Sequence, residues 1–155
     1  MTTDTSFPDT DTDKNLDIAC TTVAGEIART DGKASLLLAF NGAVLAGLAT
    51  TAGHPLPIAA QAFGAAAVLA LAAAAVLLLL VVRPRLGGND RASFPYWAGL
   101  DDDAIRACMR GDSRAARIRV LSTIAVRKFT QLRHAVDMSL SALALLLLAA
   151  VTALL

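Results

Sequence analysis

Four residues could do chemistry because they are polar or charged and lie beside or inside long apolar stretches: Asp31, Lys33, Asn41 and Lys128. Asp31 and Lys33 come just before an apolar run, and Asn41 lies in the middle of that run. A buried amide is costly unless it is hydrogen-bonded. Asn41 therefore either makes an interhelical hydrogen bond or provides polar lining at an oligomer or pore seam. These types of residue suggest gating or helix packing rather than catalysis.

The charged residues allow two interpretations. In one, Asp31 pairs with a basic residue at the membrane edge, with Lys128 as the candidate and Arg127 and Arg133 as competitors. Such a pair would hold cytosolic helices against the membrane spans. In the other, Lys33 extends to the lipid headgroups and Asp31 is solvated.

Sequence motifs of enzymes and of metal sites are missing. The chain has no glycine-rich phosphate loop, no HExxH pair and no nucleophile beside an evident base. Cys20 and Cys108 lie far apart, and neither has a second Cys or a His at ligand spacing. We therefore expect free thiols in a reducing compartment, no catalytic residue, no metal and no cofactor.

Composition predicts an all-α integral membrane protein. The chain is 55% hydrophobic and only 17% charged, whereas soluble domains are about 25% charged. The charges lie outside three apolar runs, which we predict as transmembrane helices over 34–52, 58–82 and 138–155. At about 1.5 Å per helical residue, each run is long enough, or nearly so, for a hydrocarbon layer about 30 Å thick.

Small residues spaced four apart predict that the first two spans pack closely as a hairpin around the turn at 53–57. They are Ala39, Ala43 and Gly47 in the first span, and Ala62, Ala66, Ala70 and Ala74 in the second.

The polar segments predict amphipathic helices that extend the spans into the cytosol. Residues 1–13, rich in Thr and Asp, are expected to be disordered. A continuous helix follows over 14–52, and the cytosolic loop 83–137 contains helices over 100–110 and 113–136. Helix 14–31 is predicted to pack on helix 113–136, with Phe129 in the core. The first face is Leu16, Cys20, Val23 and Ile27, and the second is Leu121, Ala125, Phe129 and Leu132. The second face belongs to a longer apolar stripe that also includes Ile118 and Val136.

The distribution of basic residues predicts the topology. Lys and Arg number three in 1–33, none in 53–57 and eleven in 83–137. Because positive residues stay in the cytoplasm, the N-terminus and the 83–137 loop are expected inside, and the C-terminus outside. The basic 114–133 segment is expected to contact anionic lipid headgroups, and no nucleic-acid partner is expected.

Two runs of the sequence resemble the transmembrane effector domain of the pyrimidine cyclase anti-phage system (Pycsar). The first is ARTDGKASLLLAFNGAVLAGL, from Ala28 to Leu48, with Asp31, Lys33-Ala34 and the central polar Asn41. The second is VLSTIAVRKFTQLRHAVDMSLSALALLLL, which is similar to the returning helix of that family and has Lys128 at the matching place. The resemblance covers about 14–155. Similar stand-alone actinobacterial proteins are described as integral membrane plasmid transfer proteins.

The resemblance implies a multi-pass plasma-membrane effector of antiviral defence and abortive infection. A cyclic-nucleotide signal would trigger it to impair membrane integrity, with a homo-oligomer in the bilayer as the expected form. The chain departs from family members that carry a fused cyclic-nucleotide-binding domain, so sensing falls to a separate sensor or cyclase system or to the cytosolic helices. The alternatives are a membrane accessory protein for plasmid transfer and a non-catalytic membrane scaffold.

Overall fold

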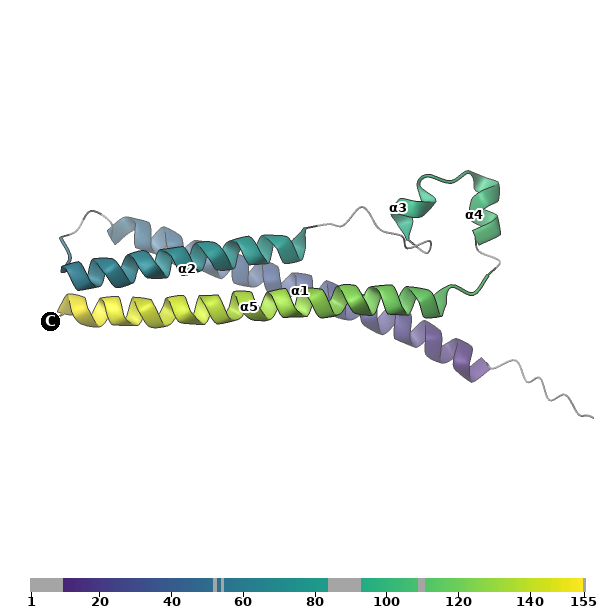
Figure 1. Ribbon diagram of the computed structural model, residues 1–155, viewed down its shortest axis with the longest axis horizontal. Coiled ribbons are helices and arrows are strands. Elements are labelled where there is room, and N and C mark those ends of the chain that lie inside the picture. Colours follow the sequence, from purple (N-terminus) through teal and green to yellow (C-terminus); the bar gives the residue numbers. More distant parts are fainter. Residues whose placement is uncertain (1–9, 52, 54, 84–92, 109–110, 155) are drawn as a thin grey trace, which may run out of the picture. The chain divides into compact units, whose positions relative to one another are not determined.

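The computed structural model describes residues 10–51, 53, 55–83, 93–108 and 111–154. In these ranges the chain forms only helices, with no strand: α1 (Thr10–Thr51), α2 (Ile58–Val82), α3 (Phe94–Trp97), α4 (Asp102–Cys108) and α5 (Arg114–Leu154) (Figure 1). The helices α1, α2 and α5 are long and apolar enough to cross a membrane. The predicted fold class, an all-α membrane protein with three spanning helices, is confirmed.

The helix ends follow local chemistry. The predicted range of the second span is that of α2, which lies between Pro57 and Arg83. The helix α1 is continuous but begins earlier than predicted, so residues 10–13, expected to be disordered, are helical. Asp11 and Asp13 lie in its first turn, where the helix dipole favours acidic residues. The rest of the predicted tail (1–9) and residues 84–92 of the predicted cytosolic loop 83–137 are outside the described residues.

The helices α4 and α5 have side-chain caps at their N-terminal ends. The Asp101 carboxylate accepts a hydrogen bond from the Ala104 N–H at 2.7 Å, which places Asp101 at the N-terminal end of α4. The Asp112 carboxylate accepts a bond from the Arg114 N–H at 2.9 Å, at the first residue of α5. These contacts satisfy N–H groups that have no partner inside the helix.

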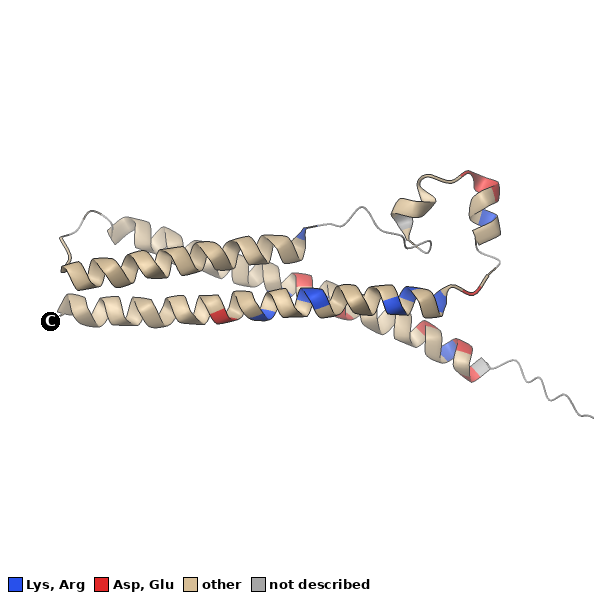
Figure 2. Ribbon diagram, viewed as in Figure 1, with Lys and Arg blue, Asp and Glu red and all other residues tan. Residues whose placement is uncertain are grey.

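The chain divides into two compact units. We call Met1–Ala28 with Pro84–Val126 the charged unit, and Arg29–Arg83 with Arg127–Leu155 the apolar bundle. The helices α1 and α5 contribute to both units. Figure 2 shows that charged residues are absent from α2 and from the C-terminal parts of α1 and α5. The bundle therefore contains the segments suited to lipid.

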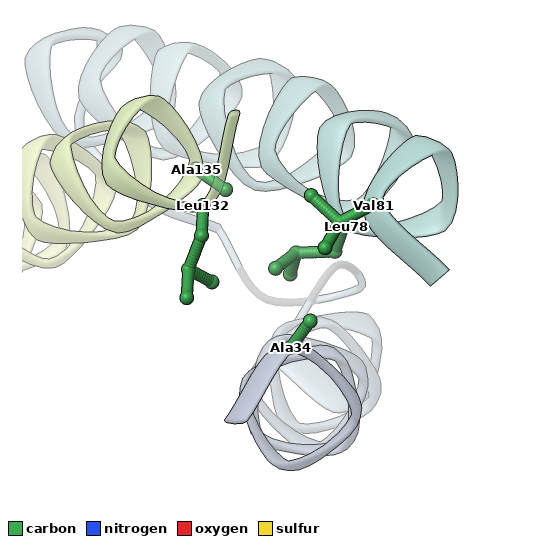
Figure 3. Close-up of a cluster of buried hydrophobic side chains, with 5 residues drawn as sticks. All are labelled: Ala34, Leu78, Val81, Leu132 and Ala135. Atoms are coloured by element: carbon green, nitrogen blue, oxygen red, sulfur yellow. The ribbon is translucent and has the colours of Figure 1, made fainter. Parts of the chain in front are cut away.

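Inward-facing positions in the bundle recur at alternating intervals of three and four residues. This is the spacing of left-handed helix bundles, and we call each such row of buried or half-buried positions a seam. The seams are Thr30, Ala34, Leu37, Asn41, Val44 and Leu48 on α1; Ala60, Gly64, Ala67, Leu71, Ala74, Leu78 and Val81 on α2; and Lys128, Leu132, Ala135, Ser139, Ala142, Leu146 and Ala149 on α5. Figure 3 shows the layer where they meet, formed by Ala34, Leu78, Val81, Leu132 and Ala135.

The predicted small-residue packing faces are wrong in most positions. Ala39, Ala43, Gly47, Ala62 and Ala66 are exposed, whereas Ala70 is half-buried and Ala74 is buried. A row of residues every four positions drifts around a helix that has 3.6 residues per turn. A row that alternates three and four follows one side, and this is the row that the bundle buries.

The predicted core position of Phe129 is also wrong. Leu16, Cys20, Val23 and Ile27 are half-buried in the charged unit, as are Ile118, Leu121 and Ala125. Phe129 is 43% exposed and Val136 is exposed as well. After Ala125 the α5 seam advances by three residues to Lys128 rather than by four to Phe129. The prediction chose Phe129 because it is apolar, but the inward-facing position is that of its charged neighbour Lys128.

Candidate functional site

An ion pair joins α1 to α5 inside the bundle. The Lys128 Nζ lies 2.6 Å from Asp31 Oδ1 and 2.7 Å from Asp31 Oδ2, so the ammonium donates to both carboxylate oxygens. The Lys128 side chain is only 14% exposed and that of Asp31 is 34% exposed. Charge-assisted bonds of this length are among the stronger contacts in proteins. The structure thus brings together two of the predicted site residues.

The position of Lys128 on the α5 seam explains its burial. Its aliphatic stem lies between helices, and its ammonium reaches a carboxylate one residue beyond Thr30 on the α1 seam. Among the described residues, Asp31 makes no ion pair with Arg127 or Arg133, the predicted competitors. Lys33 is exposed and has no ion pair within the described parts of the chain. Lys33 therefore stands apart from the other three site residues.

A second polar contact lies deeper in the bundle. The Asn41 Nδ2 donates to Ser139 Oγ at 3.0 Å, and Ser139 Oγ also lies 3.2 Å from Asn41 Oδ1. Both side chains are buried, at 0% and 3% exposed. The Ser139 hydroxyl also lies 2.9 Å from the Ala135 carbonyl oxygen, a second acceptor for its one proton. Asn41 therefore makes an interhelical hydrogen bond within one chain.

The two polar contacts share one register. Asp31 and Lys128 are separated by 97 residues in the chain, and Asn41 and Ser139 by 98. A nearly constant offset means that α1 and α5 run parallel in the bundle. The colours of Figure 1 show α2 running the opposite way. Ser139 was not predicted as a site residue, although this offset from Asn41 and its seam position identify it.

A different polar cluster surrounds Arg114 in the charged unit. Its guanidinium pairs with Asp13, with Asp17 at 3.2 Å and with Asp112 at 3.0 Å. Its carbonyl oxygen also accepts a weak bond from the Cys20 thiol at 3.9 Å. Hydrogen bonds from Arg114 lower the pKa of Asp112, and hydrogen bonds to Asp112 raise the pKa of Arg114. Sequence reasoning missed this cluster, although Asp17 and Arg114 also differ by 97 residues.

These contacts join α1 to α5. Among the described residues, no group of three His, Cys, Asp or Glu side chains is placed to hold a metal ion. The profile of the Pycsar effector protein domain matches residues 15–155. The chain belongs to the Pycsar effector family.

Membership in the Pycsar effector family makes the protein an effector of anti-phage defence and associates it with the membrane and with a separate cyclase or sensor system. The match includes both polar contacts of the bundle and, in the Arg114 cluster, Asp17, Asp112 and Arg114, whereas Asp13 lies just before the matched range. Neither curated proteins nor solved structures give a significant match to the chain.

Proposed function

We propose that the protein impairs membrane integrity when a cyclic-nucleotide signal releases its bundle from a closed state. The observation that carries this proposal is the Asp31–Lys128 pair, which is partly buried between two helices long and apolar enough to cross a membrane. Apolar side chains alone could hold these helices as an inert anchor. A charged pair costs desolvation and is sensitive to changes in its surroundings, which suits a switch. In this proposal the protein acts as an effector without catalytic activity.

The closed state depends on both polar contacts between α1 and α5. In this proposal a signal that shifts α1 along α5 breaks the constant register and separates Asp31 from Lys128 and Asn41 from Ser139. Coupling of about 1–3 kcal/mol between a trigger and such a contact changes an equilibrium by about 5- to 150-fold. Modest movement in the polar segments therefore suffices to change the state of the bundle.

The proposed orientation places the N-terminus and the segment 83–137 in the cytoplasm and the C-terminus outside the plasma membrane. The basic residues, three in 1–33 and eleven in 83–137, support it. The parallel course of α1 and α5 agrees with two helices that enter the membrane from the same side. A membrane-impermeant thiol reagent on intact spheroplasts should label neither Cys20 nor Cys108, and labelling of Cys108 would reverse the orientation.

The trigger is proposed to reach the chain from the cytoplasm, where the charged unit would lie. A separate cyclic-nucleotide sensor or cyclase system, or the charged unit itself, would receive the signal. Copies of the chain would act together in the bilayer as a homo-oligomer, without a nucleic-acid partner.

Membrane potential distinguishes this function from the alternatives. Cells that express the chain would receive cyclic CMP or cyclic UMP from an inducible cyclase, and a voltage-sensitive dye would report depolarisation. We expect rapid depolarisation only when both proteins are present. Cells that stay polarised at normal protein level would instead indicate a plasmid-transfer accessory protein or a membrane scaffold.

A further inference from the structure

Asp137 is a charged residue of the apolar bundle that the contacts described above do not use. It is exposed on α5, and its carboxylate has no hydrogen bond or ion pair among the described residues. The register of 97 residues that relates Asp31 to Lys128 places Asp137 level with Phe40 of α1. Phe40 lies about 10 Å further along α1 than Lys33, the last charged residue before its apolar run.

The core layer shared with α2 gives an independent estimate of the level of Asp137 along the bundle. Leu78 and Val81 of α2 share one core layer with Leu132 and Ala135 of α5 (Figure 3). Because α2 runs antiparallel to α5, Asp137 is level with the α2 residues about one half-turn before Leu78, near Val76. Phe40 and Val76 are both exposed apolar side chains. Asp137, the last residue before the predicted third span, is therefore level with exposed apolar side chains on both other helices of the bundle.

A carboxylate at the membrane edge, level with these apolar side chains, is favoured by a partner of opposite charge. Lys and Arg can extend their charge to the headgroups, but the short side chain of Asp cannot. Ionisable residues within membrane helices almost always face protein or water and pair with one another. Asp137 is thus the residue that most strongly indicates a missing protein surface.

Other polar residues lie beside Asp137. Arg133, Asp137 and Ser141 are spaced four apart, with His134 next to them, and all are exposed. We call these four residues the outer stripe of α5. By helical periodicity the stripe lies on the side of α5 opposite its buried seam. Figure 2 shows that charged residues continue along α5 toward its apolar C-terminal part.

We propose that a second copy of this chain docks on the outer stripe of α5, α5 against α5. Two copies inserted in the same direction place their α5 helices parallel, with equal residues at equal depth. Arg133 and Asp137 have opposite charge and lie one turn apart, so Arg133 of each copy can reach Asp137 of the other. This surface is complementary to itself, which a two-fold contact requires. The proposal deepens the self-association included in the proposed function by naming its surface.

Cysteine cross-linking in membranes tests the contact directly. Ser141→Cys would be introduced into the full-length chain with Cys20→Ser and Cys108→Ser, and oxidised in native membranes without any trigger. A two-fold α5 contact predicts an abundant disulfide-linked dimer. Ala72→Cys is the matched control, because Ala72 is exposed on α2 at about the level of Ser141. It should give little dimer.

Charge exchange tests the pairing. Asp137→Arg should lower the yield of cross-linked dimer, and Arg133→Asp combined with Asp137→Arg should restore it. Two symmetric polar contacts between membrane helices should together change association by about tenfold.

Each outcome of the two tests is decisive. A dimer from Ser141→Cys alone, lost and restored with the charges, supports the proposal. It is overturned by equal dimer from Ala72→Cys, by no dimer, by no restoration, or by cross-linking of Ser141→Cys to a different protein. Because the assay needs no trigger and reads no membrane potential, failure of the proposed function would leave this result unchanged.

Discussion

Breaking the Asp31–Lys128 pair from either side should have unequal effects on stability. Asp31→Asn leaves an ammonium whose side chain is only 14% exposed, whereas removing Lys128 leaves a carboxylate that is 34% exposed and open to solvent. Removing one partner of a fully buried pair costs about 3–5 kcal/mol. Since this pair is partly exposed, we expect Asp31→Asn to cost about 1–3 kcal/mol.

Removing Lys128 should reduce the free energy of unfolding by less than Asp31→Asn does. Lys128→Met keeps an unbranched stem on the α5 seam and removes the buried charge. Its remaining cost should approach that of losing an exposed pair, about 0–1 kcal/mol. The double variant Asp31→Asn/Lys128→Met leaves no unpaired charge and should be more stable than Asp31→Asn alone.

The free energy of unfolding can be measured for the wild type, the two single variants and the double variant. Each purified protein would be titrated with sodium dodecyl sulfate in mixed detergent micelles, and circular dichroism would report its unfolding. The order predicted for the loss of stability is Asp31→Asn greatest, then the double variant and Lys128→Met. Equal losses for the two single variants, or a larger loss for Lys128→Met, would refute the reasoning from burial.

Two other contacts and the exposed Phe129 side chain give predictions for the same unfolding assay. Ser139→Ala should cost about 1–3 kcal/mol because it leaves the buried Asn41 amide without its partner, and more than Asn41→Ala, after which the Ser139 hydroxyl keeps a carbonyl acceptor; the reverse order would contradict this. Phe129→Ala should cost less than the about 3–5 kcal/mol of a core phenylalanine, because Phe129 is 43% exposed; a loss in that range would return it to the core. Asp112, whose pKa is lowered by Arg114, contributes stability above its ordinary pKa of 3.8 that is lost as pH falls through its lower folded value. Arg114→Met should therefore reduce the loss of stability on acidification below about pH 4, and an unchanged acid profile would show that the cluster contributes nothing.

The sequence was informative where polar and apolar segments alternate. Two prolines and a charged residue bound the second apolar run, so the range of α2 was predictable. The continuity of α1 followed from the lack of a strong helix breaker between its polar and apolar halves. The pairing of Asp31 with Lys128 could be proposed because Asp31 lies at the edge of the first apolar run and Lys128 lies in the helix that leads into the third.

The sequence was much less informative about which side of each span faces inward. In water an apolar stripe marks the packed face of a helix, but in lipid the outward face is apolar too. The exposed Ala39 and Ala43 could not be told from the buried Ala67 and Ala74 by residue type. Phe129 was preferred over Lys128 as a core residue for the same reason. The alternating three and four spacing of the seams, rather than hydrophobicity, carries this information.

The resting membrane potential of cells that express charge variants of the Asp31–Lys128 pair tests the central claim most directly. A voltage-sensitive dye would compare Asp31→Asn, the exchanged variant Asp31→Lys/Lys128→Asp, and the control Asp103→Asn at equal protein level and without a trigger. Asp103 is 94% exposed, and among the described residues its ion-pair partner is Arg106, three positions along the same helix. The account predicts that Asp31→Asn depolarises cells, whereas Asp103→Asn does not and the exchanged variant retains most of the wild-type potential. Normal potential with Asp31→Asn, or equal depolarisation with the exchanged variant, would contradict the claim that this pair holds the bundle closed.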